Sequence, residues 1–311
     1  MTKVFIDGSA GTTGLRIHDR LSARTELELI TLPDELRKDS AARREAMNGA
    51  DIVFLCLPDA AAIEAVSMIE NPNTAVIDTS TAHRTNPDWA YGFAELGLRQ
   101  EIAASKRIAN PGCHASGFVA LVAPLVKAGL ISHEAALSCF SLTGYSGGGK
   151  KMIAEYEGTV RDPRLSAPRQ YALGQAHKHL PEMCAVTGLT NAPAFCPIVG
   201  DFYSGMEVTV PLFARDLYGS VEEIRNIYRA CYNTALVHYE EGSDEAGFLS
   251  ANAFADRDDM EIRVEGNDER VLLVARFDNL GKGASGAAIQ NMNILLGVDE
   301  TTGLVINGGA K

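Results

Sequence analysis

The first part of the chain alternates between short apolar runs and helical patterns. Apolar runs at residues 4–6, 27–32, 51–57 and 75–77 predict strands, and helical patterns fill the intervals between them. Repeated strand–helix–strand units imply a parallel sheet with right-handed crossovers. We therefore expect an α/β domain whose ligands bind at the carboxyl ends of the strands.

The second half of the chain has a different pattern. Residues 205–213 alternate apolar and polar positions, as a half-buried strand does. Further strands are predicted at residues 137–143, 260–264 and 270–277. A capping box at 220–223 opens a helix, and another helical pattern covers 287–296. The expected second domain is therefore α+β, with a mixed and largely antiparallel sheet.

A glycine-rich turn follows the first predicted strand. Residues 8–14 read Gly-Ser-Ala-Gly-Thr-Thr-Gly and lead into a helical pattern. Glycines permit a tight turn and a close approach of the backbone, and a helix N-terminus can receive a pyrophosphate. The spacing is one residue off the commonest fingerprint, and glycine turns also join strands to helices without a ligand. Its place at the start of the alternation favours a Rossmann-type nucleotide site.

The residues after the second predicted strand bear on the choice of nucleotide. An NAD enzyme often places an acid there for the ribose 2′-hydroxyl. Here the strand ends at Leu32, and Arg37 and Lys38 follow soon after. These cations could face a 2′-phosphate, which suggests NADP. Asp34 and Glu35 lie equally near, so a solvated charged turn is the alternative.

A cysteine lies at the junction between a predicted strand and a predicted helix. The segment 110–113 reads Asn-Pro-Gly-Cys and connects a short strand at 107–109 with a largely apolar helical run at 118–127. Unpaired backbone N–H groups and the positive end of a helix dipole favour a thiolate at such a position. Cys113 is therefore a candidate nucleophile. The alternative is a buried cysteine that behaves as a small apolar residue.

Two histidines are candidate proton carriers. His177 and His179 flank Lys178, and Glu182 follows three residues after the second histidine. Histidine is the commonest general acid or base near neutral pH. A metal site is the rival interpretation, and we discount it because no further cluster of ligands is found. His114 is a poor base for Cys113, because neighbouring side chains on a helix diverge.

Composition narrows the range of functions. A length of 311 residues suggests about two domains. The net charge of −12 and the lack of a basic cluster argue against binding of nucleic acid. Six scattered cysteines without a CxxC pair favour reduced thiols in a cytoplasmic enzyme over disulfides or a zinc site. We expect no signal peptide and no membrane span, because the chain starts on a strand-like run and no apolar run is long enough.

Several segments match a known family in residue type and order. They are residues 78–84, 91–96, 110–113, 177–182, 282–286 and 290–293. Through them the whole chain resembles N-acetyl-gamma-glutamyl-phosphate reductases of the shorter type, in the superfamily of aspartate-semialdehyde and glyceraldehyde-phosphate dehydrogenases. The resemblance implies NADPH-dependent reduction of N-acetyl-L-glutamyl 5-phosphate to N-acetyl-L-glutamate 5-semialdehyde, with release of phosphate, in arginine biosynthesis.

The resemblance also implies roles for individual residues. Cys113 would form a thioester, His177 would carry the proton with His179 as the second choice, and no metal would take part. The residues expected to hold NADP are Gly8, Ser9, Gly11, Thr12, Thr13, Gly14, Ser80 and Asn291. Those expected to contact the substrate are Arg84, Ser146, Lys150 and Glu182.

The family's domain plan is carried over in the same way. Residues 1–112, completed by the C-terminal helix at 285–311, would form a Rossmann-type NADP domain. Residues 113–284 would form the catalytic domain, which also carries the oligomerisation surface. Because such enzymes are commonly homo-oligomers, we expect a dimer or tetramer.

The chain departs from the commoner family pattern at three positions. His114 and Ser116 stand where an aromatic residue and a threonine are usual, and Lys178 replaces an arginine that could bind a carboxylate with two parallel hydrogen bonds. Three alternatives stay open at this point. They are the same chemistry on a longer or carrier-bound acyl phosphate of a lysine pathway, a non-catalytic NADP sensor, and a metal-dependent hydrolase that uses His177, His179 and Glu182.

Overall fold

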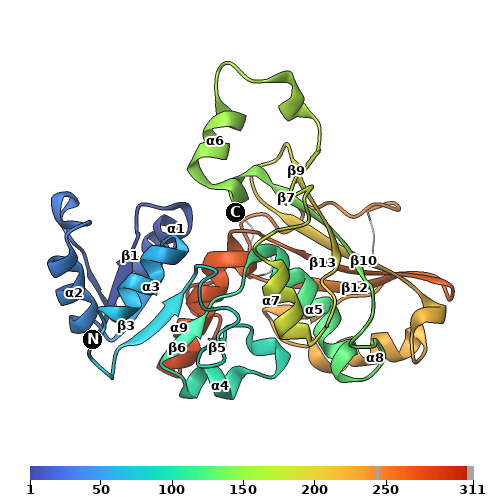
Figure 1. Cartoon of the computed structure of the whole chain (residues 1–311), viewed down its shortest axis with the longest axis horizontal. Coiled ribbons are helices and arrows are strands. Elements are labelled where there is room, and N and C mark those ends of the chain that lie inside the picture. Colours follow the sequence, from blue (N-terminus) through green and yellow to red (C-terminus); the bar gives the residue numbers. More distant parts are fainter. Residues whose placement is uncertain (243–244, 307–311) are drawn as a thin grey trace. The chain divides into compact units, whose positions relative to one another are not determined.

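The computed structural model describes residues 1–242 and 245–306. The chain divides into two units, whose helices and strands are labelled in Figure 1. The first unit contains Met1–Gly112 and Ala284–Leu304, and the second contains Cys113–Gly283 together with the described residues Val305 and Ile306. The chain therefore leaves the first unit at Gly112 and begins the second with the candidate nucleophile.

The first unit is built on a six-stranded sheet with the order β2-β1-β3-β4-β6-β5. Every neighbouring pair in this sheet is parallel. The strands are β1 (Thr2–Asp7), β2 (Leu27–Ile30), β3 (Ile52–Leu55), β4 (Ala75–Asp78), β5 (Ala90–Tyr91) and β6 (Arg107–Ala109). This arrangement confirms the predicted Rossmann-type sheet.

Helices cover both faces of the parallel sheet. They are α1 (Thr12–Ser22), α2 (Ser40–Gly49), α3 (Asp59–Ser67), α4 (Arg99–Ala104) and α9 (Gly286–Leu296). One apolar core joins the sheet to α1, α4 and α9, and a second joins it to α2 and α3. Strands covered in this way are buried on both faces, which explains why β3 reads as the continuous apolar run Ile-Val-Phe-Leu.

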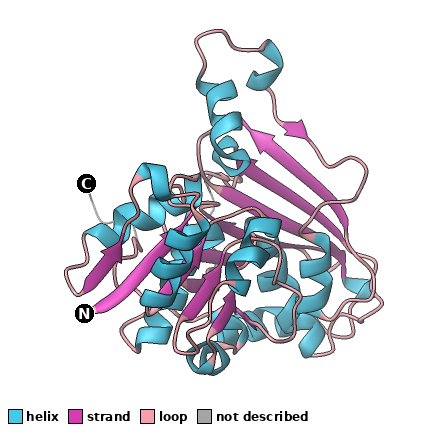
Figure 2. Cartoon of the chain, turned by 60° about the vertical axis from the view of Figure 1, so that its left-hand side comes forward, coloured by secondary structure: helices cyan, strands magenta, loops and turns pink. Residues whose placement is uncertain are grey.

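The second unit contains a seven-stranded sheet with the order β11-β12-β13-β10-β7-β9-β8. Its pairs are antiparallel except for β11 with β12 and β7 with β9, so the predicted mixed, largely antiparallel sheet is confirmed. Figure 2 shows its long strands side by side. The strands are β7 (Ser138–Gly144), β8 (Arg169–Gln170), β9 (Ala194–Gly200), β10 (Met206–Phe213), β11 (Val237–Tyr239), β12 (Met260–Gly266) and β13 (Arg270–Phe277).

Among the described residues of the second unit, four α-helices accompany the sheet. They are α5 (Cys113–Lys127), α6 (Gly149–Glu157), α7 (Leu180–Thr187) and α8 (Val221–Cys231). The predicted capping box is present, because Ser220 and Glu223 bond each other's backbone N–H groups at the start of α8. Helix α6 lies on an excursion that protrudes beyond β7 and β9 (Figure 1). Within the described residues, no helix is long and apolar enough to cross a membrane.

The first turn of α5 packs very closely on the sheet of the second unit. A Cβ on Gly117 would lie 2.5 Å from Cγ2 of Val208 on β10 and 3.0 Å from the ring of Phe277 on β13. No side chain larger than hydrogen fits such a gap without displacing its neighbours. Gly117 therefore lets the start of α5, and with it Cys113, sit directly against β10 and β13.

Candidate active site

The glycine turn of the first unit forms a tight cradle between β1 and α1. Gly8 adopts a φ of +86°, and a Cβ there would lie 2.3 Å from the carbonyl oxygen of Cys56. A Cβ on Gly14 would lie 2.4 Å from the carbonyl oxygen of Gly8. Gly11 precedes α1 and offers its N-terminal N–H groups no side-chain cap. The turn thus presents backbone N–H groups in the arrangement that receives a phosphate.

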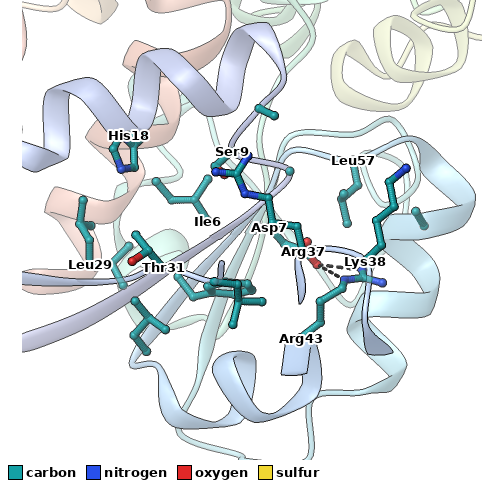
Figure 3. A pocket seen from close by; sticks show the side chains of 17 residues that line it. Ile6, Asp7, Ser9, His18, Leu29, Thr31, Arg37, Lys38, Arg43 and Leu57 are labelled. Atoms are coloured by element: carbon teal, nitrogen blue, oxygen red, sulfur yellow. Dashed lines mark hydrogen bonds and ion pairs between the residues drawn. The ribbon is translucent and has the colours of Figure 1, made fainter. Parts of the chain in front are cut away.

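A cavity of about 400 Å³ lies beside this turn (Figure 3). Its lining combines apolar side chains with polar and cationic ones, among them Ile6, Ser9, Leu29, Thr31, Arg37, Lys38 and Leu57. The cavity reaches the end of β2, where Thr31 stands in place of an acid. Asp7, at the end of β1, is buried and bound through its carboxylate to Arg43 at 2.8 and 3.1 Å. The negative charge of Asp7 is therefore balanced by the guanidinium of Arg43.

The loop after β4 is held by buried polar contacts. The backbone N–H and hydroxyl of Ser80 both donate to the buried carboxylate of Asp78, at 2.9 and 2.7 Å. Nδ1 of His83 lies 2.6 Å from the same carboxylate, and its ring stacks on Trp89. Arg84 is buried and donates to the carbonyl oxygens of Asn110 and Thr79, both at 2.9 Å. Arg84 thus ties this loop to the segment that leads to Cys113.

Helix α9 brings an amide to the same edge of the parallel sheet. Nδ2 of Asn291 donates to the carbonyl oxygen of Gly92 at 3.0 Å and to Oδ1 of Asn110 at 3.1 Å. Within the described residues its Oδ1 is buried without a hydrogen-bond partner. An unsatisfied buried acceptor costs free energy unless a ligand supplies a donor. The site therefore fits a group with an N–H, such as a carboxamide.

In the second unit, Cys113 is the first residue of a 15-residue helix and is partly exposed. The π-helical turn η6 (Gly281–Ser285) passes close by, because a Cβ on Gly283 would lie 3.0 Å from Cβ of Cys113. Such turns are frequent at functional sites. Burial raises the pKa of Cys56 to about 12 and raises that of Cys184 as well. The position of Cys113 favours the opposite, a stabilised thiolate.

Three histidine rings gather next to this helix start. Ring centroids lie 5.5 Å apart for His114 and His177, 5.6 Å for His114 and His179, and 4.7 Å for His177 and His179. The backbone N–H of His179 donates to Nδ1 of His177 at 3.2 Å and orients that ring. Burial, and then the charge of Lys178, lower the pKa of His177. Within the described residues, neither these rings nor any other three His, Cys, Asp or Glu side chains are arranged so that they could hold a metal ion.

The residues expected to contact the substrate differ in burial and in the elements that carry them. Ser146 is buried and accepts a hydrogen bond from Nδ2 of Asn279 at 3.0 Å. Glu182 is buried in α7, one turn after His179. Lys150 is exposed on the first turn of α6. The structure therefore places Cys113 and His114 on α5, and Glu182 on the neighbouring α7 with His177 and His179 just before it, whereas Lys150 lies on the excursion.

One part of the second-unit site is not predictable from the sequence. The ring of His114 is buried between the hydroxyls of Ser141 and Tyr171, each 2.7 Å from one of its nitrogens. The one indication in the sequence is a serine in the middle of the predicted strand at 137–143. Nothing in the spacing of these three residues predicts that they meet.

Comparison with known proteins agrees with these features. Residues 33–105 match the family model of the semialdehyde dehydrogenase NAD binding domain, and residues 113–279 match that of the semialdehyde dehydrogenase dimerisation domain. The chain is 47% identical to an N-acetyl-gamma-glutamyl-phosphate reductase of Burkholderia lata, over 94% of this chain and 96% of the relative. It is 46% identical to an N-acetyl-gamma-glutamyl-phosphate reductase of Brucella anthropi, over 95% of this chain and 98% of the relative.

Solved structures show the same fold at low sequence identity. Aspartate semialdehyde dehydrogenase II of Vibrio cholerae, complexed with ASA, superimposes with a TM-score of 0.70 at 16% identity, over 95% of this chain and 98% of that one. The aspartate semialdehyde dehydrogenase of Francisella tularensis also superimposes with a TM-score of 0.70, at 14% identity, over 95% of this chain and 100% of that one.

Proposed function

The chain belongs to the N-acetyl-gamma-glutamyl-phosphate reductases, and from this premise we propose that Cys113 is the nucleophile of an NADPH-dependent reduction. The reaction converts N-acetyl-L-glutamyl 5-phosphate to N-acetyl-L-glutamate 5-semialdehyde and releases phosphate, in arginine biosynthesis. One observation carries the assignment of the nucleophile. Cys113 is a partly exposed thiol at the first position of a long helix, and the next residue belongs to a histidine cluster.

The thiol supports a two-stage reaction. The thiolate of Cys113 attacks the acyl carbon, the bond from that carbon to the phosphate oxygen breaks, and a thioester remains. The dipole and the N–H groups at the start of α5 stabilise the thiolate and the negative charge on the carbonyl oxygen. NADPH, when bound, supplies the hydride that reduces the thioester carbon. Collapse of the thiohemiacetal on Cys113 releases the aldehyde and restores the thiolate.

Residues of the first unit fit a nicotinamide nucleotide. The cradle of Gly8, Gly11 and Gly14 leaves no space for a Cβ at Gly8 or Gly14, as expected of a glycine turn whose backbone approaches a pyrophosphate closely. Oδ1 of Asn291 can accept from the carboxamide of the nicotinamide. The cavity at the end of β2 offers Arg37 and Lys38 for a 2′-phosphate, so we assign NADP as the cofactor.

Replacing both Arg37 and Lys38 by alanine is expected to raise the KM for NADPH by about 10- to 100-fold and to leave that for NADH nearly unchanged. The ion pair of Arg37 with Asp34 is solvent-exposed, so breaking it costs little free energy. Arg37 can therefore exchange Asp34 for a phosphate of the cofactor. Arg44→Ala is the matched control, since this exposed arginine pairs with Glu70 instead of lining the cavity. Equal changes for the two cofactors would rule out 2′-phosphate recognition by these cations.

We assign proton transfer to His177, which is partly exposed and can exchange protons with solvent, and keep His179 as the second choice. In the reverse reaction, neutral His177 accepts the proton of the thiohemiacetal hydroxyl on Nδ1, in exchange for the 3.2 Å hydrogen bond from the backbone N–H of His179. Because burial and then the charge of Lys178 lower the pKa of His177 from its ordinary value, its neutral form persists to lower pH than that of a free imidazole. The acidic decline of the reverse kcat/KM is therefore expected at lower pH than an unperturbed histidine would give.

Lys178 supplies a sharper form of this pH prediction. Lys178→Met removes a charge that lowers the pKa of His177, so the acidic decline of the reverse kcat/KM is expected to move to higher pH. Lys178→Arg keeps the charge and is the matched control, with a profile like that of the wild type. If the two variants give the same profile, His177 is not the group that titrates.

The experiment that tests the proposed function is phosphate-dependent reduction of NADP by N-acetylglutamate semialdehyde, which is the reverse reaction. We expect turnover that requires both phosphate and the semialdehyde. If the protein binds NADPH but shows no turnover with this aldehyde, the substrate assignment is wrong. A longer or carrier-bound acyl group is then the next substrate to assay.

We also propose that the protein is a homo-oligomer, a dimer or tetramer in the cytoplasm. The second unit matches a dimerisation domain, and one face of its sheet exposes Phe140, Phe213 and Leu272. An exposed apolar patch of this kind is typical of an interaction surface. A monomeric mass in sedimentation equilibrium would contradict this proposal.

A further inference from the structure

A buried hydrogen-bond relay lies directly behind the candidate nucleophile. Ser141, in the middle of β7, places its Oγ 2.7 Å from Nδ1 of His114, and Nε2 of His114 lies 2.7 Å from the hydroxyl of Tyr171. Ser141 and His114 are buried, whereas Tyr171 is only partly so. The relay therefore runs from the core of the second unit towards its accessible side.

The position of each hydrogen in the relay follows from the available partners. Within the described residues, Nδ1 of His114 is the hydrogen-bond partner of the Ser141 hydroxyl, which is fully buried. The serine hydrogen needs an acceptor, so Ser141 donates to Nδ1. Burial, and then the nearby His177, lower the pKa of His114 to about 3, so the ring is neutral and carries its hydrogen on Nε2. Nε2 then donates to the phenol oxygen.

This order leaves the Tyr171 O–H free to donate to a ligand. The opposite order would leave the serine hydrogen buried without an acceptor, which native structures avoid. The backbone N–H of Tyr171 donates to the carbonyl oxygen of Pro197 at 3.0 Å, which fixes the residue beside β9. The Tyr171 ring belongs to the histidine cluster beside Cys113, with its centroid 6.1 Å from those of His114 and His177. Burial, and then the charge of Cys113, raise the pKa of Tyr171, so the phenol keeps its proton.

We propose that Tyr171 donates a hydrogen bond to the carbonyl oxygen of the acyl group carried by Cys113, and that His114 and Ser141 are positioning residues that hold its hydroxyl. This inference rests on the proposed function. The oxygen gains negative charge when the thiolate attacks and again when the thioester carbon is reduced. A preorganised neutral donor stabilises both states, and the phenol keeps its proton throughout.

The relay also gives a physical reason for the histidine after the nucleophile. A purely apolar aromatic side chain at position 114 could fill the same space but could not link Ser141 to Tyr171. His114 thus acts on the acyl oxygen through Tyr171 and does not act as a base towards the adjacent sulfur.

The test compares three variants in the forward reaction with N-acetyl-glutamyl phosphate and NADPH. Tyr171→Phe removes the hydroxyl and keeps the ring, and its kcat is expected to fall by about 10²- to 10³-fold with little change in KM. Ser141→Ala should lower kcat by a smaller factor. The double variant should be no slower than Tyr171→Phe alone, because the serine acts only through the phenol.

Tyr156→Phe is the matched control, since its buried hydroxyl has no hydrogen-bond partner within the described residues of the same unit. It should turn over like the wild type. Wild-type activity in Tyr171→Phe, or losses that multiply in the double variant, would overturn the relay while leaving the proposed function in place. An inactive wild type would instead refute the proposed function, and the relay with it.

Discussion

Cys113→Ser is expected to lower turnover by at least about 10⁴-fold while leaving the affinity for NADPH unchanged. A serine hydroxyl does not ionise near neutral pH, so the dipole and N–H groups at the start of α5 have no anion to stabilise. The substitution changes one atom and is small enough for the helix start to accept. NADPH binding, measured by fluorescence titration, reports on the first unit and should be the same in both proteins.

The matched control for this substitution is Cys196→Ser. Cys196 is another partly exposed thiol of the second unit, located on β9. We expect wild-type turnover in this variant, because β9 contributes none of the assigned catalytic groups. Comparable activity in the two variants would mean that Cys113 is not the nucleophile.

His177→Asn is expected to lower kcat by about 10²- to 10⁴-fold, the range found for the loss of a general acid or base. Asparagine keeps a polar side chain of similar size but cannot exchange a proton near neutral pH. The loss should be accompanied by disappearance of the acidic decline in the reverse pH profile. Steady-state kinetics of both directions between about pH 5 and 8 measure both effects.

His179→Asn separates the two candidate proton carriers. His179 is buried at the start of α7, where it contacts the ring of His177. A lower kcat in His179→Asn, with the acidic decline of the reverse pH profile retained, would indicate that His179 only supports His177. A larger loss at His179 than at His177, with the decline removed, would reverse the assignment.

Much of the fold can be predicted from the pattern of apolar residues. Strands β3 and β4 are buried on both faces, so they stand out as continuous apolar runs. Strand β10 is covered on one face and alternates as expected. Strand β9 is missing from the prediction, because Pro197 interrupts it and a proline argues against a strand on sequence grounds.

The site is predictable only where its chemistry is local in sequence. The change from a predicted strand to a predicted helix indicates the position of Cys113 correctly. Helix α5 nevertheless begins at Cys113 itself and not at residue 118. Gly117 allows this earlier start, because it lets a less apolar first turn pack on β10. The relay of Ser141, His114 and Tyr171 joins residues 27 and 57 positions apart, which meet only after the second sheet has formed. Periodicity contains no information about such contacts.

The proposed reaction passes through a thioester on Cys113, which can be trapped by adding N-acetyl-glutamyl phosphate to the protein without NADPH. The mass of the protein and the phosphate released are then measured. We expect about one phosphate per site and one N-acetylglutamyl group on the peptide that contains Cys113, and later addition of NADPH should remove this group as the semialdehyde. Turnover by a protein that never carries this group on Cys113 would rule out the thioester.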